Sequence, residues 1–357
     1  MIYDLENRLA RRWLGVVILA LMLASAGCDR RGDEKSPPTA QQVVVYTSVD
    51  RLFSEPVLKE AEKRLGLKVI GVYDTEETKS TGLVNRLIAR KDNPDGDIFW
   101  SGDPLRAALL KAKGVTAAYD PPAAASIPAL YKDPEHHWIG FSARSRVLLV
   151  NTNLVPAGDE PRRLAELTDP KWKGKVAIAN PLFGTTSFHV ASIFEALGDE
   201  KARQWLAALK ANDVQIVSSN GEVKRQVASG GTAVGLTDSD DAAEAIKDGQ
   251  AVRAVFLDQE GGDGALLGDL VIQNTVSLIH GSPNPDGAKK VIDFLLSAEA
   301  QRLLAESCAQ APLTPGIAVP PGILVLDKIV PMNVNYATAA ATLERILPWL
   351  KEWVEQK

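Results

Sequence analysis

The sequence predicts an α/β protein built as two halves, and three observations support this prediction. Apolar, β-prone runs alternate with helix-forming segments along most of the chain. The chain has 357 residues, which is long for one hydrophobic core. Its 45% apolar and 24% charged residues are typical of a globular protein, and they exclude a disordered, a collagen-like or a multi-span membrane chain.

The first strand–helix–strand unit is predicted from residue 43 onward. Residues 43–47 (VVVYT) are β-branched and apolar, as in a buried parallel strand. Ser54, followed by an acidic residue and Pro56, is typical of a helix start, and Gly66 of a helix end. Residues 68–73 form the second strand, so the crossover should be right-handed.

The same alternation continues to the C-terminus. Further strands are predicted at 97–100, 138–151, 175–179, 214–218, 232–236, 252–257 and 269–279. Helices are predicted at 81–90, 104–113, 187–197, 199–210, 221–228, 240–248, 286–308 and 336–355.

The N-terminus resembles an export signal. Residues 1–27 hold a basic start and an apolar stretch at 14–24, which is short for a membrane-spanning helix. Small residues precede Cys28, as in a bacterial lipobox, so lipidation of Cys28 is expected. The alternative is cleavage near Ala26 that leaves Cys28 as a free thiol. Residues 28–42 are then the lipidated cysteine and a flexible tether.

Composition and motifs disfavour several functions. The 40 basic and 45 acidic residues give a net charge of −5, so no nucleic-acid partner is expected. Two cysteines, Cys28 and Cys308, make no disulfide framework, and Cys308 is expected to be a buried, inert thiol. No phosphate-binding loop or nucleophile elbow occurs, so we expect no enzyme and no catalytic cofactor. His189 is expected on a helix surface or in the helix cap.

Five short stretches carry a family resemblance. They are VVVYTS at 43–48, YDTEETKSTGL at 73–83, LTDPKWKGK at 167–175, GLTDSDD at 235–241 and NTV at 274–276. In this order and spacing they resemble the extracellular solute-binding proteins of ABC importers, in the branch that contains periplasmic ferric-ion-binding proteins. The resemblance spans residues 43–316. It implies a type II periplasmic-binding-protein fold, in which two α/β lobes are joined by two crossover strands and the ligand cleft lies between them.

The resemblance also implies domain limits and partners. Lobe 1 is expected at 43–143 plus 272–316, lobe 2 at 144–271, and a C-terminal helical segment that packs on the lobes at 317–357. The crossings are expected near 141–146 and 270–275. An ABC permease and its ATPase would be the partners of a monomer in the periplasm or at the cell surface, held to a membrane by its lipid anchor.

Ligands of open α/β sheets bind beyond the carboxyl ends of the strands, and this rule selects candidate residues. The candidates for ligand binding are Tyr46, Ser48, Ser101, Gly184, Thr185, Thr186, Asn220 and Thr237. The candidates for holding a metal ion are Asp50, Asp103, Asp238 and Asp240. The helix starts favour an anion and the carboxylates favour a hard cation. Asp238 and Asp240 could instead serve only as caps of the next helix.

The resemblance assigns roles to some of these positions. Tyr46 matches the tyrosine that closes the family's first strand, and Asp50 stands where ferric binders carry a histidine. Asp103 is the carboxylate nearest to the position of their glutamate, and Ser239-Asp240 replaces their adjacent tyrosines. The resemblance therefore implies a ferric ion, with a small anion, as the transported ligand. The alternatives are an organic solute such as a polyamine, phosphonate or sugar phosphate, or a sensor subunit.

Overall fold

The computed structural model describes residues 42–74, 81–260 and 267–356. All of these residues lie in one compact unit that covers residues 40–357. The predicted signal segment and Cys28 lie outside the described residues. Within the described part of the chain, no helix combines the length and the apolar character needed to cross a membrane.

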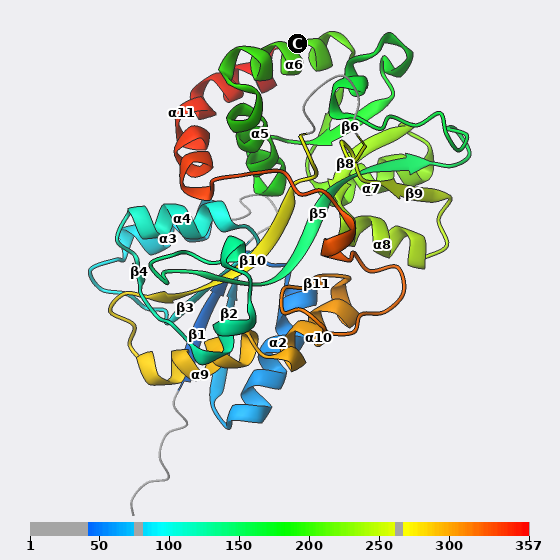
Figure 1. The fold of residues 1–357 in the computed structure, drawn as a ribbon. Helices are drawn as coiled ribbons and strands as arrows, with labels where there is room; N and C mark the ends of the chain where they lie inside the picture. Colours follow the sequence, from blue (N-terminus) through cyan, green and yellow to red (C-terminus); the bar gives the residue numbers. More distant parts are fainter. Residues whose placement is uncertain (1–41, 75–80, 261–266, 357) are drawn as a thin grey trace, which may run out of the picture. The chain divides into compact units, whose positions relative to one another are not determined.

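The described strands form one curled, mixed sheet of eleven strands (Figure 1). Its main path runs β2-β1-β3-β10-β5-β8-β6-β7, and β4, β9 and β11 pair at its sides. The strands are β1 (Gln42–Thr47), β2 (Lys68–Tyr73), β3 (Ile98–Ser101), β4 (Thr116–Ala117), β5 (Ile139–Asn151), β6 (Val176–Ala179), β7 (Gln215–Val217), β8 (Val234–Asp238), β9 (Val252–Val255), β10 (Val271–Ile279) and β11 (Ala311–Pro312). β1 is parallel to β2 and β3, and β6 is parallel to β7 and β8.

Strand β5 joins the two halves of the sheet. From Ile139 to Ser145 it pairs with β10, and from Arg146 it pairs with β8. The change of partner between Ser145 and Arg146 falls in the segment where the sequence predicts a crossing. All 13 residues of β5 are buried, including its two arginines.

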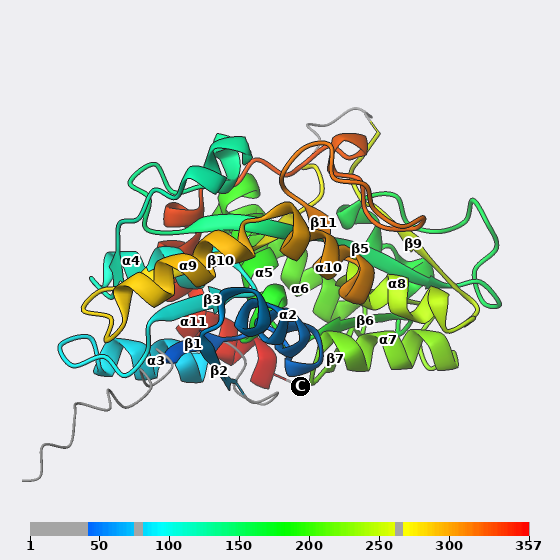
Figure 2. The ribbon, with the colours of Figure 1, turned by 90° about the horizontal axis from the view of Figure 1, so that it is seen from below.

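Helices cover both faces of each half of the sheet (Figures 1 and 2). They are α2 (Arg51–Leu65), α3 (Thr81–Ala89), α4 (Pro104–Ala112), α5 (Gly184–Leu197), α6 (Asp199–Ala211), α7 (Asn220–Ser229), α8 (Ser239–Lys247), α9 (Pro285–Leu295), α10 (Ala298–Cys308) and α11 (Tyr336–Glu355). Apolar residues of α2, α9 and α10 form one core with the first half, and those of α3 and α4 pack on its other face. In the second half, α5, α6 and α11 share one core, and α7 and α8 share another.

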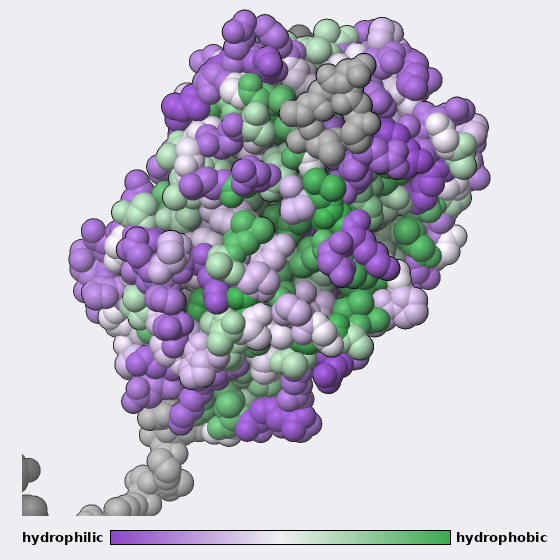
Figure 3. Space-filling view, viewed as in Figure 1, coloured by the Kyte–Doolittle hydropathy of each residue, from purple (hydrophilic) through white to green (hydrophobic). Residues whose placement is uncertain are grey.

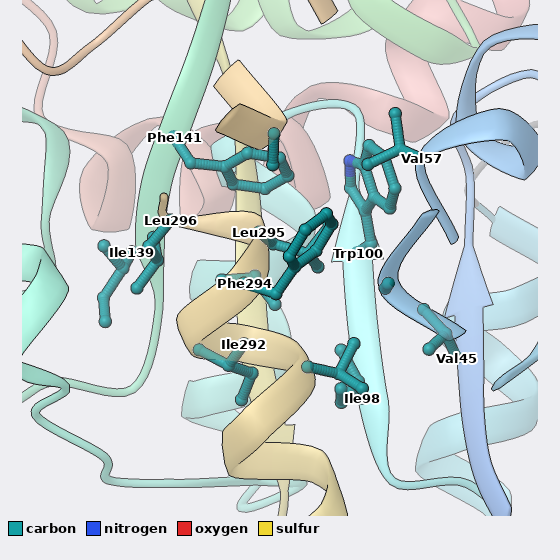
Figure 4. Close-up of a cluster of buried hydrophobic side chains, with 14 of the residues drawn as sticks. Val45, Val57, Ile98, Trp100, Ile139, Phe141, Ile292, Phe294, Leu295 and Leu296 are labelled. Carbon is teal, nitrogen blue, oxygen red and sulfur yellow. The ribbon is translucent and has the colours of Figure 1, made fainter. Parts of the chain in front are cut away.

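The largest core lies under α9 (Figure 4). Trp100 of β3 meets the edge of Phe141 of β5 with ring centroids 5.3 Å apart, and both rings are fully buried. Ile292 and Leu295 of α9 cover these strands. Burial of large side chains of this kind is the main favourable contribution to folding.

Several helix boundaries differ from the sequence-based expectation, and two of them have a clear local cause. Helix α2 begins at Arg51, because the carbonyl of Asp50 already accepts from the N–H groups of Phe53 and Ser54. Ser54 does not cap the helix, and its hydroxyl instead donates to the carbonyls of Val49 and Asp50. The region predicted as one helix at 286–308 divides into α9 and α10, because Ser297 caps a new helix by accepting from Ala300 N.

The C-terminal helix α11 contacts both halves of the fold. It packs against α4 and α5, and Tyr336 meets the rings of Trp138 and Phe188 at 5.6 and 6.1 Å. Arg345 pairs with Asp199 at the start of α6.

On the face of the molecule seen in Figure 3, hydrophilic residues dominate the periphery, and hydrophobic residues are more frequent toward the middle.

Candidate functional site

Arg144 stands on β5 just before the strand changes its partner. Its Nε donates to Oδ2 of Asp238 at 3.1 Å, and its Nη1 donates to Oδ1 of Asn274 at 3.5 Å. Oδ2 of Asp240 lies 3.6 Å from the same Nε. Burial disfavours the charged guanidinium, but Asp238 and Asp240 outweigh burial and raise the pKa of Arg144. The guanidinium of Arg144 therefore stays charged at the junction of the two halves.

Arg146, two residues further along β5, binds the other carboxylate oxygen of Asp238. Its Nη1 donates to Oδ1 of Asp238 at 2.7 Å and to Oδ1 of Asn220 at 3.1 Å. Oδ2 of Asp238 accepts from Oγ1 of Thr185 at 2.8 Å and from Nδ2 of Asn220 at 3.1 Å. Burial alone would raise the pKa of Asp238, but Arg146 and Arg144 outweigh burial and lower this pKa. The carboxylate is thus ionised and held by two guanidinium groups.

The arginines carry more N–H groups than their neighbours accept. Nε and Nη2 of Arg146 and Nε of Arg106 are buried without a hydrogen-bond partner among the described residues. Nη2 of Arg106, on α4, donates to Oγ of Ser187 on α5 at 3.3 Å, which connects the two halves. Buried N–H groups without a partner are costly, so they indicate a place for an acceptor or a water.

Helices α5 and α7 begin beside this cluster of charges. α5 starts at Gly184, whose φ of +56° suits glycine, and its N-cap residue Phe183 supplies no side-chain cap. Oγ1 of Thr186 donates to Oδ1 of Asn220, the first residue of α7, at 3.3 Å. Free N–H groups and the helix dipole make the start of α5 favourable for negative charge.

The carboxyl ends of β1 and β3 adjoin Arg144. Oγ of Ser48 accepts from Gly102 N at 2.9 Å, and Oγ of Ser101 accepts from Asp103 N at 3.3 Å. A Cβ atom placed on Gly102 would lie 3.7 Å from both Nη2 of Arg144 and Oγ of Ser48. Asp103 caps α4 by accepting from Arg106 N at 3.1 Å. Burial raises the pKa of Asp103, and the nearby Arg106 offsets only part of this effect.

Three carboxylates at the start of α8 are close enough to share an ion. One oxygen from each of Asp238, Asp240 and Asp241 lies within 4.8 Å of the others. Burial raises the pKa of Asp240 to about 7. The charge of Arg144 opposes this rise, and the charges of Asp241 and Asp238 add to it. Oγ1 of Thr237 donates to Oδ2 of Asp241 at 2.9 Å. Asp238 makes no side-chain cap bond to α8, so its carboxylate serves the arginines and not the helix.

The structure places the hydroxyl of the candidate Tyr46 outside this cluster. Tyr46 is 1% exposed, and its hydroxyl donates to Oδ1 of Asp95 at 2.7 Å. Asp95 precedes β3, so the hydroxyl of Tyr46 lies near the amino end of β3. Burial and Asp95 raise the pKa of Tyr46 to about 12. Asp50 is half-buried at the N-cap of α2. The candidates that the structure brings together are Ser48, Ser101, Asp103, Gly184, Thr185, Thr186, Asn220, Thr237, Asp238 and Asp240.

The expected surface position of His189 is wrong. His189 is 6% exposed, and burial together with Arg146 lowers its pKa to about 3, so the imidazole is neutral. With Arg146 and Asp269 it lines a cavity of about 10 Å³, which has room for one water. Cys308 is a free, buried thiol as expected, and burial raises its pKa to about 12.

Sequence reasoning missed the arginines. Arg106, Arg144 and Arg146 were not among its candidate residues, although Arg144 and Arg146 interrupt an apolar strand two residues apart. Residues i and i+2 of a strand lie on one face, so two charges at this spacing in a buried strand indicate a paired polar site. This signal was present in the sequence.

Comparisons with known proteins agree with the fold and differ in the solute. The profile of a family described as bacterial extracellular solute-binding protein matches residues 96–324. Iron uptake protein A1 of a Synechocystis species is 26% identical over 348 residues, which cover 94% of this chain and 91% of the relative. A putative 2-aminoethylphosphonate-binding periplasmic protein of Salmonella typhi is 25% identical over 327 residues, with 89% of both chains covered.

A solved structure resembles the whole fold. The periplasmic binding protein AfuA from Actinobacillus pleuropneumoniae, with exogenous fructose-6-phosphate bound, superimposes with a TM-score of 0.76 at 23% identity. The match covers 88% of this chain and 98% of AfuA. The architecture is that of a type II periplasmic binding protein.

Proposed function

Because the chain belongs to the bacterial extracellular solute-binding protein family, we propose that it captures an organic solute with an anionic group for an ABC importer. The family consists of binding proteins and not of enzymes. The proposed partners are the permease and the ATPase of the importer. The proposed solute carries a phosphonate, phosphate or carboxylate group, and it binds where β5 meets β8.

One observation carries this proposal. Buried guanidinium N–H groups of Arg106 and Arg146 have no partner among the described residues, and they lie beside the start of α5. Arg144 adds a third guanidinium, which is 11% exposed. Charge-assisted hydrogen bonds from guanidinium and helix N–H groups are well suited to the oxygens of such an anion. The names of two relatives, a phosphonate binder and a sugar-phosphate complex, support the same class.

Ferric iron with a small anion is the second candidate. The mutual approach of the Asp238, Asp240 and Asp241 carboxylates within 4.8 Å favours it, as does the similarity to iron uptake protein A1. The charges around Asp238 argue for the organic anion, because a trivalent cation would lie beside Arg144 and Arg146. By the sequence resemblance, Ser239 and Asp240 stand roughly where ferric binders carry adjacent tyrosines, so the site would lack that pair.

The proposed function requires two halves that move relative to each other and a chain that is exported. The two halves, 43–143 with 272–316 and 144–271, would close over the solute by a hinge at the crossing strands. Residues 317–357 would remain packed on both. The chain would be exported to the periplasm or the cell surface, with the signal 1–27 removed and Cys28 lipidated.

Calorimetry with the full chain tests the solute. The titrants are 2-aminoethylphosphonate, fructose 6-phosphate, citrate and ferric citrate. We expect one of the two phosphorus compounds to bind at one site per chain, and ferric citrate to bind no more tightly than citrate. The variant Arg144→Gln should lose this binding, whereas Lys351→Gln on the exposed face of α11 should keep it. Binding of ferric citrate alone, at one iron per chain, would select the second candidate instead.

A further inference from the structure

A cavity separate from the arginine cluster lies in the second half of the fold, at the opposite end of strand β8. Its volume is about 560 Å³, and it lies among the loops that precede β6 and β8 and the loop that follows β5. Volumes of this size are typical of small-molecule sites. Its lining includes Leu154, Pro156, Lys171, Trp172, Lys175 and Thr232. Ala233, at this cavity, and Asp238 are separated by β8, which spans about 16 Å at the usual rise per residue.

Two of the lining residues carry polar atoms without a partner. Nε1 of Trp172 and Oγ1 of Thr232 are buried and have no hydrogen-bond partner among the described residues. The side chains of Trp172 and Thr232 are 5% and 2% exposed. A buried indole N–H usually finds an acceptor, so its lack of one beside a cavity is informative.

The rim of the cavity carries positive charge. Lys171 and Lys175 are exposed, and neither forms an ion pair with a described acidic residue, while Asp159 is the one acidic residue of the lining. Nζ of Lys171 lies 5.2 Å from the centroid of the Trp172 ring. Lys173, between them in the sequence, does not line the cavity and pairs with Asp213 at 2.8 Å. The lining is thus cationic at its rim.

Apolar residues form part of the wall of the cavity. Leu154 is 53% exposed here, and Val155, Pro156 and Ala233 line the wall beside Trp172. A ligand with an apolar body and one negative group would cover Leu154, meet the lysines and supply an acceptor. We propose that this cavity is a second ligand site of the protein, for a small carboxylate with an aromatic or aliphatic body. The proposal does not depend on the solute bound near Asp238.

Calorimetry with benzoate as the probe tests the second site on the full chain. We expect benzoate to bind at one site per chain, and Lys171→Gln/Lys175→Gln to weaken this binding about tenfold through the loss of charge-assisted contacts. Thr232→Val, which keeps the shape and removes the hydroxyl, should weaken it as well. Lys173→Gln, from the same motif, and Arg144→Gln should leave it unchanged.

Four results would overturn the second site. They are the absence of benzoate binding, binding that the double lysine variant retains in full, binding that Arg144→Gln abolishes, and benzylamine binding as tight as that of benzoate. Melting temperatures of the variants show whether each is folded. The replaced lysines are exposed, so we expect the double variant to melt like the parent protein.

Discussion

Nη1 of Arg146 lies 2.7 Å from Oδ1 of Asp238, and both side chains are buried where β5 pairs with β8. Arg144 holds the second oxygen of the same carboxylate at 3.1 Å. Two arginines of the strand that joins the halves therefore share one aspartate from the second half. The stability of the fold and the charge of the site depend on the same three residues.

Removing the charge of Asp238 should destabilise the protein strongly. Asp238→Asn keeps the shape of the side chain but leaves the buried guanidinium of Arg146 without its counter-charge, and Arg144 keeps only the more distant carboxyl group of Asp240 at 3.6 Å. We expect a loss of about 3–5 kcal/mol in the free energy of unfolding, as for other broken buried pairs. Urea denaturation measures it. Asp248→Asn, at the exposed end of α8, is the matched control and should change stability by less than about 0.5 kcal/mol. A loss as small as that of the control would contradict the buried ion pairs of Asp238.

His189 should make stability depend on pH. Its folded pKa of about 3 lies below the ordinary value of 6.5, so the unfolded chain binds the proton more readily than the folded one. The contribution of His189 is complete above pH 6.5 and is lost progressively as the pH falls toward 3. His189→Gln should flatten the fall in stability across this range, measured by urea denaturation at successive pH values. His280→Gln replaces an exposed histidine and should leave the profile unchanged.

Asp240 should make anion affinity depend on pH, if the proposed solute class is right. Its pKa of about 7 means that the carboxyl group is mostly neutral below pH 7 and mostly charged above pH 7. A charged Asp240 beside Arg144 repels an incoming anion, so affinity should fall as the pH rises through 7. Calorimetry with 2-aminoethylphosphonate at pH 6 and pH 8 measures the ratio of affinities for the wild type and for Asp240→Asn. Equal ratios in the two proteins would show that Asp240 does not act on the solute.

The C-terminal helix should be essential to the stability of the second half. Ile346 of α11 is 0% exposed in the core that it shares with α5 and α6. Ile346→Ala removes buried methyl groups and should cost about 2–5 kcal/mol. Glu344→Ala, on the exposed face of the same helix, is the control. If chemical denaturation gave the two variants the same stability, α11 would not be part of this core.

The helix and strand pattern could be predicted because it depends on local periodicity. The strand at 43–47 and the helix start after Asp238 appear close to their predicted places. Ser54 shows the limit of local rules, since a serine before an acidic residue and a proline resembles a cap, yet the helix begins at Arg51. The helix start after Asp50, which wins over a start at Ser54, depends on the direction in which the chain leaves β1.

The α/β alternation, the family resemblance and most of the polar loop ends can be predicted from the residues in order, because spacing along one chain is enough for these. What surrounds the carboxylates becomes visible only in the folded chain. Asp238 is separated from Arg144 by 94 residues, and their 3.1 Å contact arises from the pairing of β5 with β8. Whether a carboxylate faces a cation or water is set by such long-range pairing, and that choice determines the charge of a binding site.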